Sequence, residues 1–288
     1  MKSTIATFVL LLSTQIIYAQ AAGNAVYGSS TKRDGVNKYI VASQNDSQFV
    51  VTANVLYVKK ADYLKITFAI TSFDKTLENS KKQSDETIDK LSSNFRKVNQ
   101  GIQFFVDYVG HNRVYGLQKE GSDYIEVLKG FELKRNVIVI AKDHDEMNKI
   151  IEAASNSGVF DVAKVEYVVE NIPEIEDFLI DKASSILQKK AGKIITLNNL
   201  TGFVAQRLFD LEFKSFSPSD LYVKYEAAVT QDVDFGRKSN SNIVYQQPVV
   251  SFYFQGLNHS GFDEIIEEEK LEPAVQFAIS LKMVYAKK

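Results

Sequence analysis

The residues of this chain that could bind a metal ion or transfer a proton are few and scattered. It contains no cysteine and three histidines, His111, His144 and His259. The densest titratable group is the stretch 143–146, Asp-His-Asp-Glu. Consecutive helical residues point in different directions, so these side chains cannot easily chelate one ion together. The stretch fits a helix start, with Asp143 as N-cap and Glu146 as its capping-box partner. We interpret it as a cap with a solvated histidine.

The other titratable residues show no catalytic pattern. His111 falls in a predicted turn and His259 in a polar loop, and neither has an identifiable partner. The sequence contains no Gly-x-Ser-x-Gly, no glycine-rich phosphate loop and no His-Glu-x-x-His. Glu264 and Glu268 have the i,i+4 spacing of an exposed helix face, and the acidic run 267–269 also fits a solvated helix face. We therefore assign no catalytic, cofactor-binding or metal-binding residue, and we expect neither an enzyme nor a cofactor.

One apolar stretch is a candidate interaction surface. Residues 248–254 read Pro-Val-Val-Ser-Phe-Tyr-Phe. Such a run can be an inner strand of the domain, or an edge strand that pairs with a neighbouring subunit, because apolar strand edges attract partners. Pro248 suits either an edge strand or the beginning of a strand. Both interpretations stay open at this point.

The first residues have the three-part layout of a secretory signal. Lys2 supplies a positive charge, Ile5–Leu12 form a short apolar core, and Ala19-Gln20-Ala21 fits a small-x-small cleavage site. Polar residues interrupt the apolar core, which is also too short to span a membrane comfortably. We predict a signal peptide over residues 1–21 and a periplasmic, exported protein, released because no cysteine is available to carry a lipid.

The composition fits a globular chain held together by core packing. Of the 288 residues, 45% are hydrophobic, which is enough for a sizeable core. The formal net charge of −2 argues against nucleic acid as a partner. Without cysteine, neither disulfides nor thiol catalysis can operate. No segment after the signal approaches the ~20 continuous apolar residues of a spanning helix.

Local patterns predict strands and helices after a flexible lead-in at 22–47. The predicted strands cover 49–58, 63–70, 102–109, 113–117, 131–141, 162–169, 194–197, 203–213, 221–230, 244–254 and 276–285. The predicted helices run from an Asp74 cap to Gly101, from Asp143 to Gly158 and from Pro173 to Gly192.

Further features complete this prediction. A turn at 110–112 separates two of the strands, and a polar loop spans 234–242. The last strand alternates and predicts one buried and one wetter face. The predicted fold is α+β: antiparallel-rich sheets packed by about three main helices, with two strand–helix–strand units, 63–109 and 131–169, and a strand-rich C-terminal part.

The order of these elements resembles the SIMPL domain family, which includes periplasmic and outer-membrane-associated immunogenic proteins. The stretch 130–171, GFELKRNVIVIAKDHDEMNKIIEAASNSGVFDVAKVEYVVEN, carries the resemblance. Gly130-Phe131 stands at the family's Gly-aromatic start, Asp143 and Asp145 at its Asp-rich helix cap, and Gly158 at its helix end. The closing SLKMVYA resembles the family's final strand. We therefore expect a SIMPL-like domain over residues 48–288.

The sequence also departs from the family pattern. It lacks a glycine-rich first strand ending near a proline and an alanine-rich third helix, and the segment 193–272 is longer than the usual connection. The resemblance implies export, no established catalytic residues, ring-like or barrel-like oligomers in some members, and roles in stress tolerance in others. We thus expect a self-assembling, non-catalytic envelope protein that forms a homo-oligomer, with outer-membrane association as a further expectation. The alternative is a periplasmic binding module that holds a peptide, lipid or small ligand in a groove between sheet and helices.

Overall fold

The computed structural model describes residues 25–27, 43–45, 47–227 and 249–288. The predicted signal peptide, most of the predicted lead-in and the predicted loop 234–242 lie outside these residues. The chain divides into two compact units. The smaller comprises Met1–Arg33 and Tyr222–Gln255, and the larger comprises Asp34–Leu221 and Gly256–Lys288.

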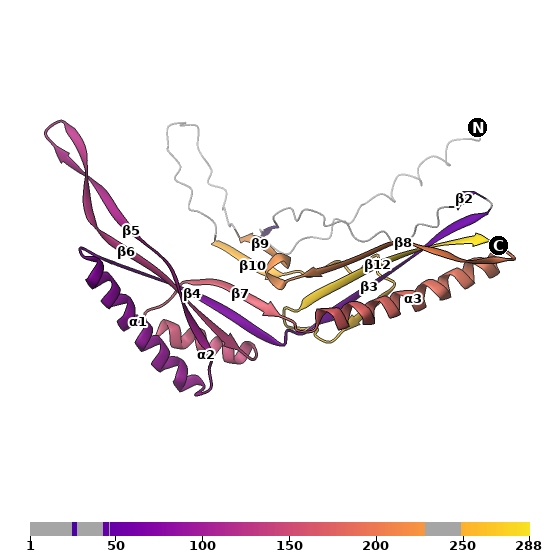
Figure 1. Cartoon of the computed structure of the whole chain (residues 1–288), viewed down its shortest axis with the longest axis horizontal. Helices are drawn as coiled ribbons and strands as arrows, with labels where there is room; N and C mark the ends of the chain where they lie inside the picture. Colours follow the sequence, from indigo (N-terminus) through magenta and orange to yellow (C-terminus); the bar gives the residue numbers. More distant parts are fainter. Residues whose placement is uncertain (1–24, 28–42, 46, 228–248) are drawn as a thin grey trace, which may run out of the picture. The chain divides into compact units, whose positions relative to one another are not determined.

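In the larger unit, both predicted strand–helix–strand segments are present and share one antiparallel sheet, ordered β5-β6-β4-β7 (Figure 1). Their elements are β4 (Tyr63–Asp74), α1 (Leu77–Val98), β5 (Phe104–Glu120), β6 (Asp123–Ala141), α2 (His144–Ser155) and β7 (Val162–Val168). The segments interleave, because β4 pairs with β6 on one side and β7 on the other. This is the β-α-β-β-α-β order of the split, ferredoxin-like arrangement.

Alternation along β4 explains why both helices cover the same face of this sheet. Leu64, Ile66, Phe68 and Ile70 are buried, and they pack in one cluster with residues of both α1 and α2. Phe95 of α1 is fully buried, with its ring centroid 5.9 Å from that of Phe68. The apolar residues that recur every second position in β4 and those that line one face of α1 therefore pack in the same core.

A second sheet of the larger unit has the order β11-β3-β12-β8, with β2 pairing β3 at its end. The elements are β2 (Ser43–Asn45), β3 (Gln48–Lys59), β8 (Phe203–Phe216), β11 (Glu264–Glu267), β12 (Val275–Lys287) and helix α3 (Ile172–Leu197), with the short 3₁₀ helix η1 (Pro218–Leu221) after β8. β3 and β12 pair antiparallel along their whole length, from Lys59 opposite Val275 to Gln48 opposite Ala286.

β3 and most of β12 are buried on both faces. One face, which includes Val51, Val55, Phe277 and Ile279, packs against α3. The other face, which includes Leu56 and Ala278, packs against Phe262 and its neighbours. The expectation of one wetter face for the last strand is therefore wrong at its N-terminal half, where even Gln276 is buried. The segment around Phe262 covers this face in the folded chain. The periodicity of a strand cannot predict contacts with a segment elsewhere in the sequence.

The smaller unit contributes a three-stranded antiparallel sheet to the described chain. β9 (Tyr222–Ala227) lies between β1 (Ala25–Tyr27) and β10 (Val249–Phe254). The predicted strand portions 228–230 and 244–248 lie outside the described residues.

Several predicted helix ends are wrong. Thr76, not Asp74, caps α1, since its side chain accepts a hydrogen bond from the Asn79 amide at 3.2 Å. The helix ends at Val98, before Gly101. α3 continues through Gly192 to Leu197, so the predicted strand 194–197 is helical. Its last turns pack onto the core beneath, through Ile194 and Ile195 among others, and this burial outweighs the weak helix preference of glycine.

The predicted turn at 110–112 is also wrong. β5 runs unbroken from Phe104 to Glu120. The register with β6 shifts between Tyr108 and Gly110, which is a β-bulge. One extra residue in a bulge lets a strand bend and twist without a turn, so the glycine and polar residues mark this irregularity instead.

An ion pair fills a gap in the edge of β3. Among the described strands, β2 pairs with β3 only at Gln48 and Phe49, and β11 only from Val55 onward. Between them, the Asp263 carboxylate accepts a hydrogen bond from the Asn54 amide (2.9 Å). Lys190 Nζ donates to the same carboxylate (2.8 Å) and to the Thr52 carbonyl (2.7 Å). Two side chains thus satisfy backbone groups that a neighbouring strand would otherwise satisfy.

Lys190→Met should destabilise the protein by about 2–3 kcal/mol, because it leaves the largely buried Asp263 without its cation. Adding Asp263→Asn should recover part of this loss. The matched control is Lys282→Met, which breaks a more exposed pair with Asp210, also 2.8 Å long, and should cost at most ~1 kcal/mol. Urea unfolding measures all three. Equal losses of unfolding free energy for Lys190→Met and Lys282→Met would show that the ion pair at the edge of β3 stabilises the protein no more than an exposed pair does.

Candidate interaction surfaces

The cap predicted at the start of α2 is confirmed. The Asp143 carboxylate accepts a hydrogen bond from the Glu146 amide at 2.8 Å, which lowers the pKa of Asp143. Glu146 is buried, and its carboxylate accepts from the Lys142 amide and from the Asn99 side chain, both at 2.8 Å. Both carboxylates are therefore engaged in holding the helix start and fixing it to the end of α1.

His144 differs from the solvated histidine expected in this cap. Its side chain is only 22% exposed. Nδ1 lies 3.1 Å from the Glu272 carboxylate, and Nε2 lies 3.3 Å from the Tyr167 hydroxyl. Tyr167 packs against the cores of both sheets. His144 thus connects α2 to β7 and to the segment before β12, a link between residues far apart in the sequence.

The other two histidines lie apart from this group. His111 sits within β5, hydrogen-bonded to the Tyr108 hydroxyl, and is not in a turn. His259 precedes β11 as expected for a loop residue, 3.9 Å from the Glu267 carboxylate. Among the described residues, no group of three His, Asp or Glu side chains is placed to hold a metal ion.

The helix face expected for Glu264 and Glu268 and for the acidic run 267–269 is wrong. Glu264–Glu267 form β11, which pairs parallel with β3, and Glu268 and Glu269 follow it outside any helix. Glu268 accepts a hydrogen bond from the Tyr57 hydroxyl, and burial together with this carboxylate raises the pKa of Tyr57. The Glu269 carboxylate accepts from three successive amides, those of Lys270, Leu271 and Glu272. A stretch rich in glutamate and lysine has helical propensity, but pairing with β3 decides its conformation.

A polar hollow of about 330 Å³ lies between the end of α1 and the start of α2. Its lining comprises Val98, Asn99, Lys142, Asp143, Asp145, Glu146 and Lys149. The polar groups of three of these residues are already hydrogen-bonded. Asp143 accepts from the Glu146 amide, and the Asn99 side chain donates to the Glu146 carboxylate and accepts from the amide that follows α1. The hollow thus combines carboxylates, amines and an amide without a nucleophile beside a base, which is the geometry of a helix junction.

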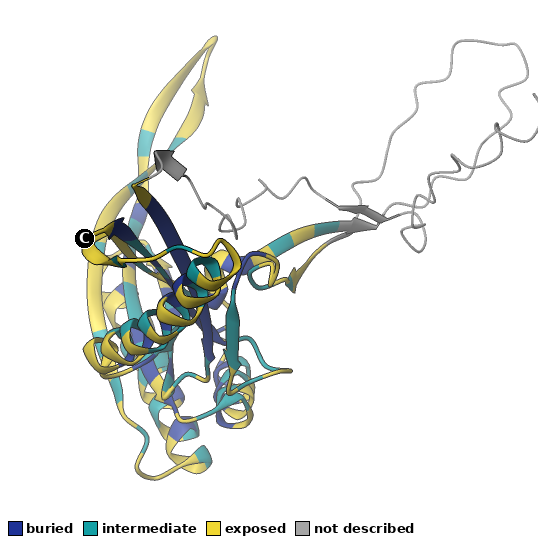
Figure 2. Ribbon diagram, turned by 90° about the vertical axis from the view of Figure 1, so that its right-hand side faces the viewer, coloured by how far each residue is buried: buried dark blue, intermediate teal, exposed yellow. Residues whose placement is uncertain are grey.

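An extension of the hairpin β5–β6 exposes several large apolar side chains close together. β4 pairs with β6 only from Phe131 to Ala141, but β5 and β6 continue to pair up to Glu120 and Asp123. Residues 114–130 therefore form a two-stranded ribbon beyond the four-stranded sheet, which we call the arm (Figure 1). Figure 2 shows the arm as almost entirely exposed.

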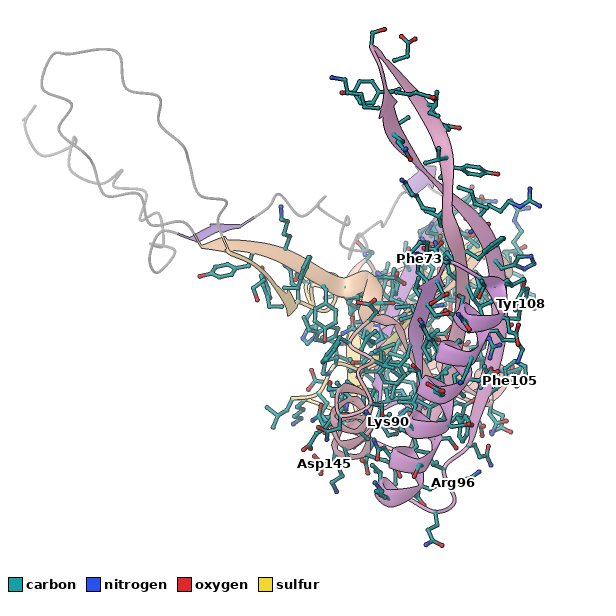
Figure 3. All side chains as sticks on the ribbon, turned by 90° about the vertical axis from the view of Figure 1, so that its left-hand side faces the viewer. Phe73, Lys90, Arg96, Phe105, Tyr108 and Asp145 are labelled. Carbon is teal, nitrogen blue, oxygen red and sulfur yellow. The ribbon has the colours of Figure 1, made fainter. Side chains whose placement is uncertain are left out.

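Glycines define both ends of the arm. At the tip, Gly121 has φ of 63°, in the left-handed region that favours glycine. At the base, a Cβ on Gly130 would lie 2.3 Å from the Asp74 carbonyl oxygen and 2.8 Å from the Phe73 ring. Gly130 therefore permits the last residues of β4 to cross closely where the arm leaves the sheet. Figure 3 labels Phe73 at this base, and Tyr108 and Phe105 farther along β5.

The two faces of the arm differ in composition. Cross-strand partners share a face, so one face carries Tyr115, Leu117, Lys119, Tyr124, Glu126 and Leu128, and we call it the aromatic face. The opposite face carries Val114, Gly116, Gln118, Glu120, Asp123, Ile125 and Val127. On the aromatic face, Leu117 and Tyr124 are 68% and 66% exposed, and Tyr115 and Leu128 are about half exposed.

The sequence prediction does not contain the arm. Its strand 113–117 stops at Leu117 and the next strand begins at Phe131, so it assigns no structure to residues 118–130. The signal that was available is the Gly121-Ser122 pair between two runs of alternating residues, which is typical of a two-residue hairpin loop.

Some of the other exposed apolar residues lie on strands at the edges of sheets. β10 pairs with β9 alone among the described strands, and its Phe252 is 62% exposed. Of the two interpretations of 248–254, the described part 249–254 fits the edge strand. β8 is an edge strand of the second sheet, with Leu208 and Phe209 about half exposed. Both edge strands thus expose large apolar side chains.

Within the described residues, the helices are either too short or too polar to cross a membrane. Comparison with known proteins places the chain more definitely. No curated protein matches it. The family model named SIMPL, described as a protein of unknown function (DUF541), matches residues 50–232, more than half of the chain. The matched range includes the ferredoxin-like sheet, its helices and the arm. The chain therefore belongs to the SIMPL family.

Proposed function

We propose that this protein is an exported, non-catalytic component of the cell envelope that self-assembles through strands left exposed by its fold. The observation that carries the proposal is the arm, a ribbon of two strands with large apolar side chains on its surface. An isolated two-stranded hairpin is marginally stable in water. Contiguous apolar patches of this kind mark interaction sites. Burial against another chain would stabilise the hairpin and remove its apolar side chains from water.

The contacts of the titratable residues support the non-catalytic part of the proposal. Asp143 and Glu146 hold the start of α2, His144 joins α2 to Tyr167 and Glu272, and Asp263 with Lys190 fills the edge of β3. Each of these groups has a structural partner, and the pKa of Asp143 is lowered by its helix cap, where ionisation serves the fold. A catalytic acid or base needs instead a pKa near the working pH.

The export part of the proposal rests on the N-terminal residues. The basic, apolar and small-residue regions of 1–21 have the order of a cleavable signal. A periplasmic location agrees with a cysteine-free chain that holds its fold by two large cores instead of disulfides. We further propose association with the outer membrane and a role in stress tolerance, on the resemblance stated for the family.

The mature chain, residues 22–288, should have a mass in solution well above that of one copy at micromolar concentration, because exposed strands pair between copies. Light scattering on the purified protein measures this mass over a dilution series. A constant mass of one chain at all concentrations would contradict self-assembly. Native mass spectrometry of the same sample tests the binding-module alternative, in which a small molecule stays bound to a single chain.

The full chain expressed in a Gram-negative bacterium should be found in the periplasmic fraction with a new N-terminus close to Ala21. N-terminal sequencing of the fractionated protein measures this. Changing Ala19 and Ala21 to bulky residues should block cleavage while leaving the rest of the chain unchanged, because the peptidase needs small residues there. Uncleaved wild-type protein in the cytoplasm would contradict export.

A further inference from the structure

We infer that the aromatic face of the arm is the contact between two copies of this chain, with two arms packed face to face about a two-fold axis. This inference rests on the proposed self-assembly and adds to it the surface, the partner and the symmetry. The aromatic face has the composition for it: Tyr115, Leu117, Tyr124 and Leu128 are contributed by both strands and occupy adjacent cross-strand pairs. Stacking two such ribbons buries these side chains on both copies at once.

The contrast between the two faces of the arm indicates which one is covered. The opposite face has three smaller apolar side chains, Val114, Ile125 and Val127, and it carries the two carboxylates Glu120 and Asp123 at its tip. It resembles an ordinary solvent-facing strand surface. The aromatic face presents four large side chains whose exposure in a monomer is unfavourable. One partner that covers the aromatic face therefore removes most of the exposed large apolar side chains of the arm from water.

A lipid surface is a poorer partner for the arm than a second copy. The tip of the arm carries the carboxylates Glu120 and Asp123, and Glu126 lies on the aromatic face itself, one cross-strand pair from Lys119. Carboxylates are costly within a bilayer and are repelled by anionic headgroups. In a contact between two ribbons, Glu120 and Asp123 stay hydrated at the tip, and Glu126 can meet a cation of the partner.

The charges on the aromatic face fit a partner identical to itself. Lys119 and Glu126 lie on this face in neighbouring cross-strand pairs, Lys119 opposite Tyr124 and Glu126 opposite Leu117. In a two-fold contact every residue of one copy meets the surface that it also contributes to the other. If the two ribbons run in the same direction, each β5 lies over the partner's β6, and Lys119 is then near the partner subunit's Glu126. A surface with only one sign of charge would repel its own copy.

The test uses the absence of cysteine in the natural chain. Leu117→Cys puts one thiol at the middle of the aromatic face, and Ile125→Cys puts one on the opposite face, one cross-strand pair farther along. Both positions are exposed, so both variants should fold. A bismaleimide with a reach of about 10 Å, the spacing of stacked sheets, should convert Leu117→Cys to covalent dimer several-fold faster than Ile125→Cys. Equal rates would overturn the inference.

Substitutions that weaken the contact complete the test. Leu117→Ser should lower the mass measured by light scattering, whereas Ile125→Ser should leave it unchanged. Lys119→Glu should also lower the mass, and the exchange Lys119→Glu with Glu126→Lys should restore it. If the wild-type chain assembles while none of these variants changes its mass, the inference about the arm fails but self-assembly stands, through other strands. If the wild-type chain is monomeric, self-assembly itself fails.

Discussion

The pairing of β3 with β12 is the constraint on which the larger unit depends. It joins residues 48–59 to residues 275–287 along their whole length. These two strands carry α3 on one face and the segment around Phe262 on the other, and they serve as neighbours for β8, β11 and β2. Closing so long a loop costs chain entropy, but the cost grows only slowly with length. Burial of both faces of two long strands supplies the compensating free energy.

A short connection leads from this central pair of strands into the ferredoxin-like sheet. β4 starts only a few residues after β3 ends, and the Asp62 amide of that connection donates to the Val168 carbonyl at 2.8 Å. The Asp62 carboxylate accepts from the Glu170 amide, and Lys60 lies 3.3 Å from Glu272, which also contacts His144. Short polar contacts between distant segments therefore surround the connection. These titratable residues therefore hold together segments that are distant in the sequence.

Strand length explains how the same fold leaves surfaces for a partner. β5 and β6 are longer than β4, so they run past the end of the sheet and form the arm, and β8 has a neighbour on one side only among the described strands. The self-assembly that we propose rests on this mismatch of lengths rather than on a specialised site.

Features set by neighbouring residues were predictable from the sequence, and features set by distant ones were not. The Asp143 cap, the Pro173 helix start and the alternation of β4 are local, and all three are present. The two-sided burial of β12 depends on Phe262, and the helical end of α3 depends on a core built from both chain ends. Residues 264–267, expected on a helix face with the acidic run that follows, form a strand because β3 offers an edge to pair with. The arm is the exception, since its Gly121-Ser122 turn between alternating residues is a local signal that the sequence prediction did not use.

Hydrogen–deuterium exchange of the arm tests the central claim, that its exposed ribbon is covered by a second copy, most directly. The backbone amides of residues 114–130 should exchange slowly at concentrations where the protein is assembled and much faster after dilution. Buried amides of β3 should be protected at both concentrations and provide the internal reference. If the arm exchanges equally fast at both concentrations while the mass shows assembly, the arm is not the covered surface and the account is contradicted.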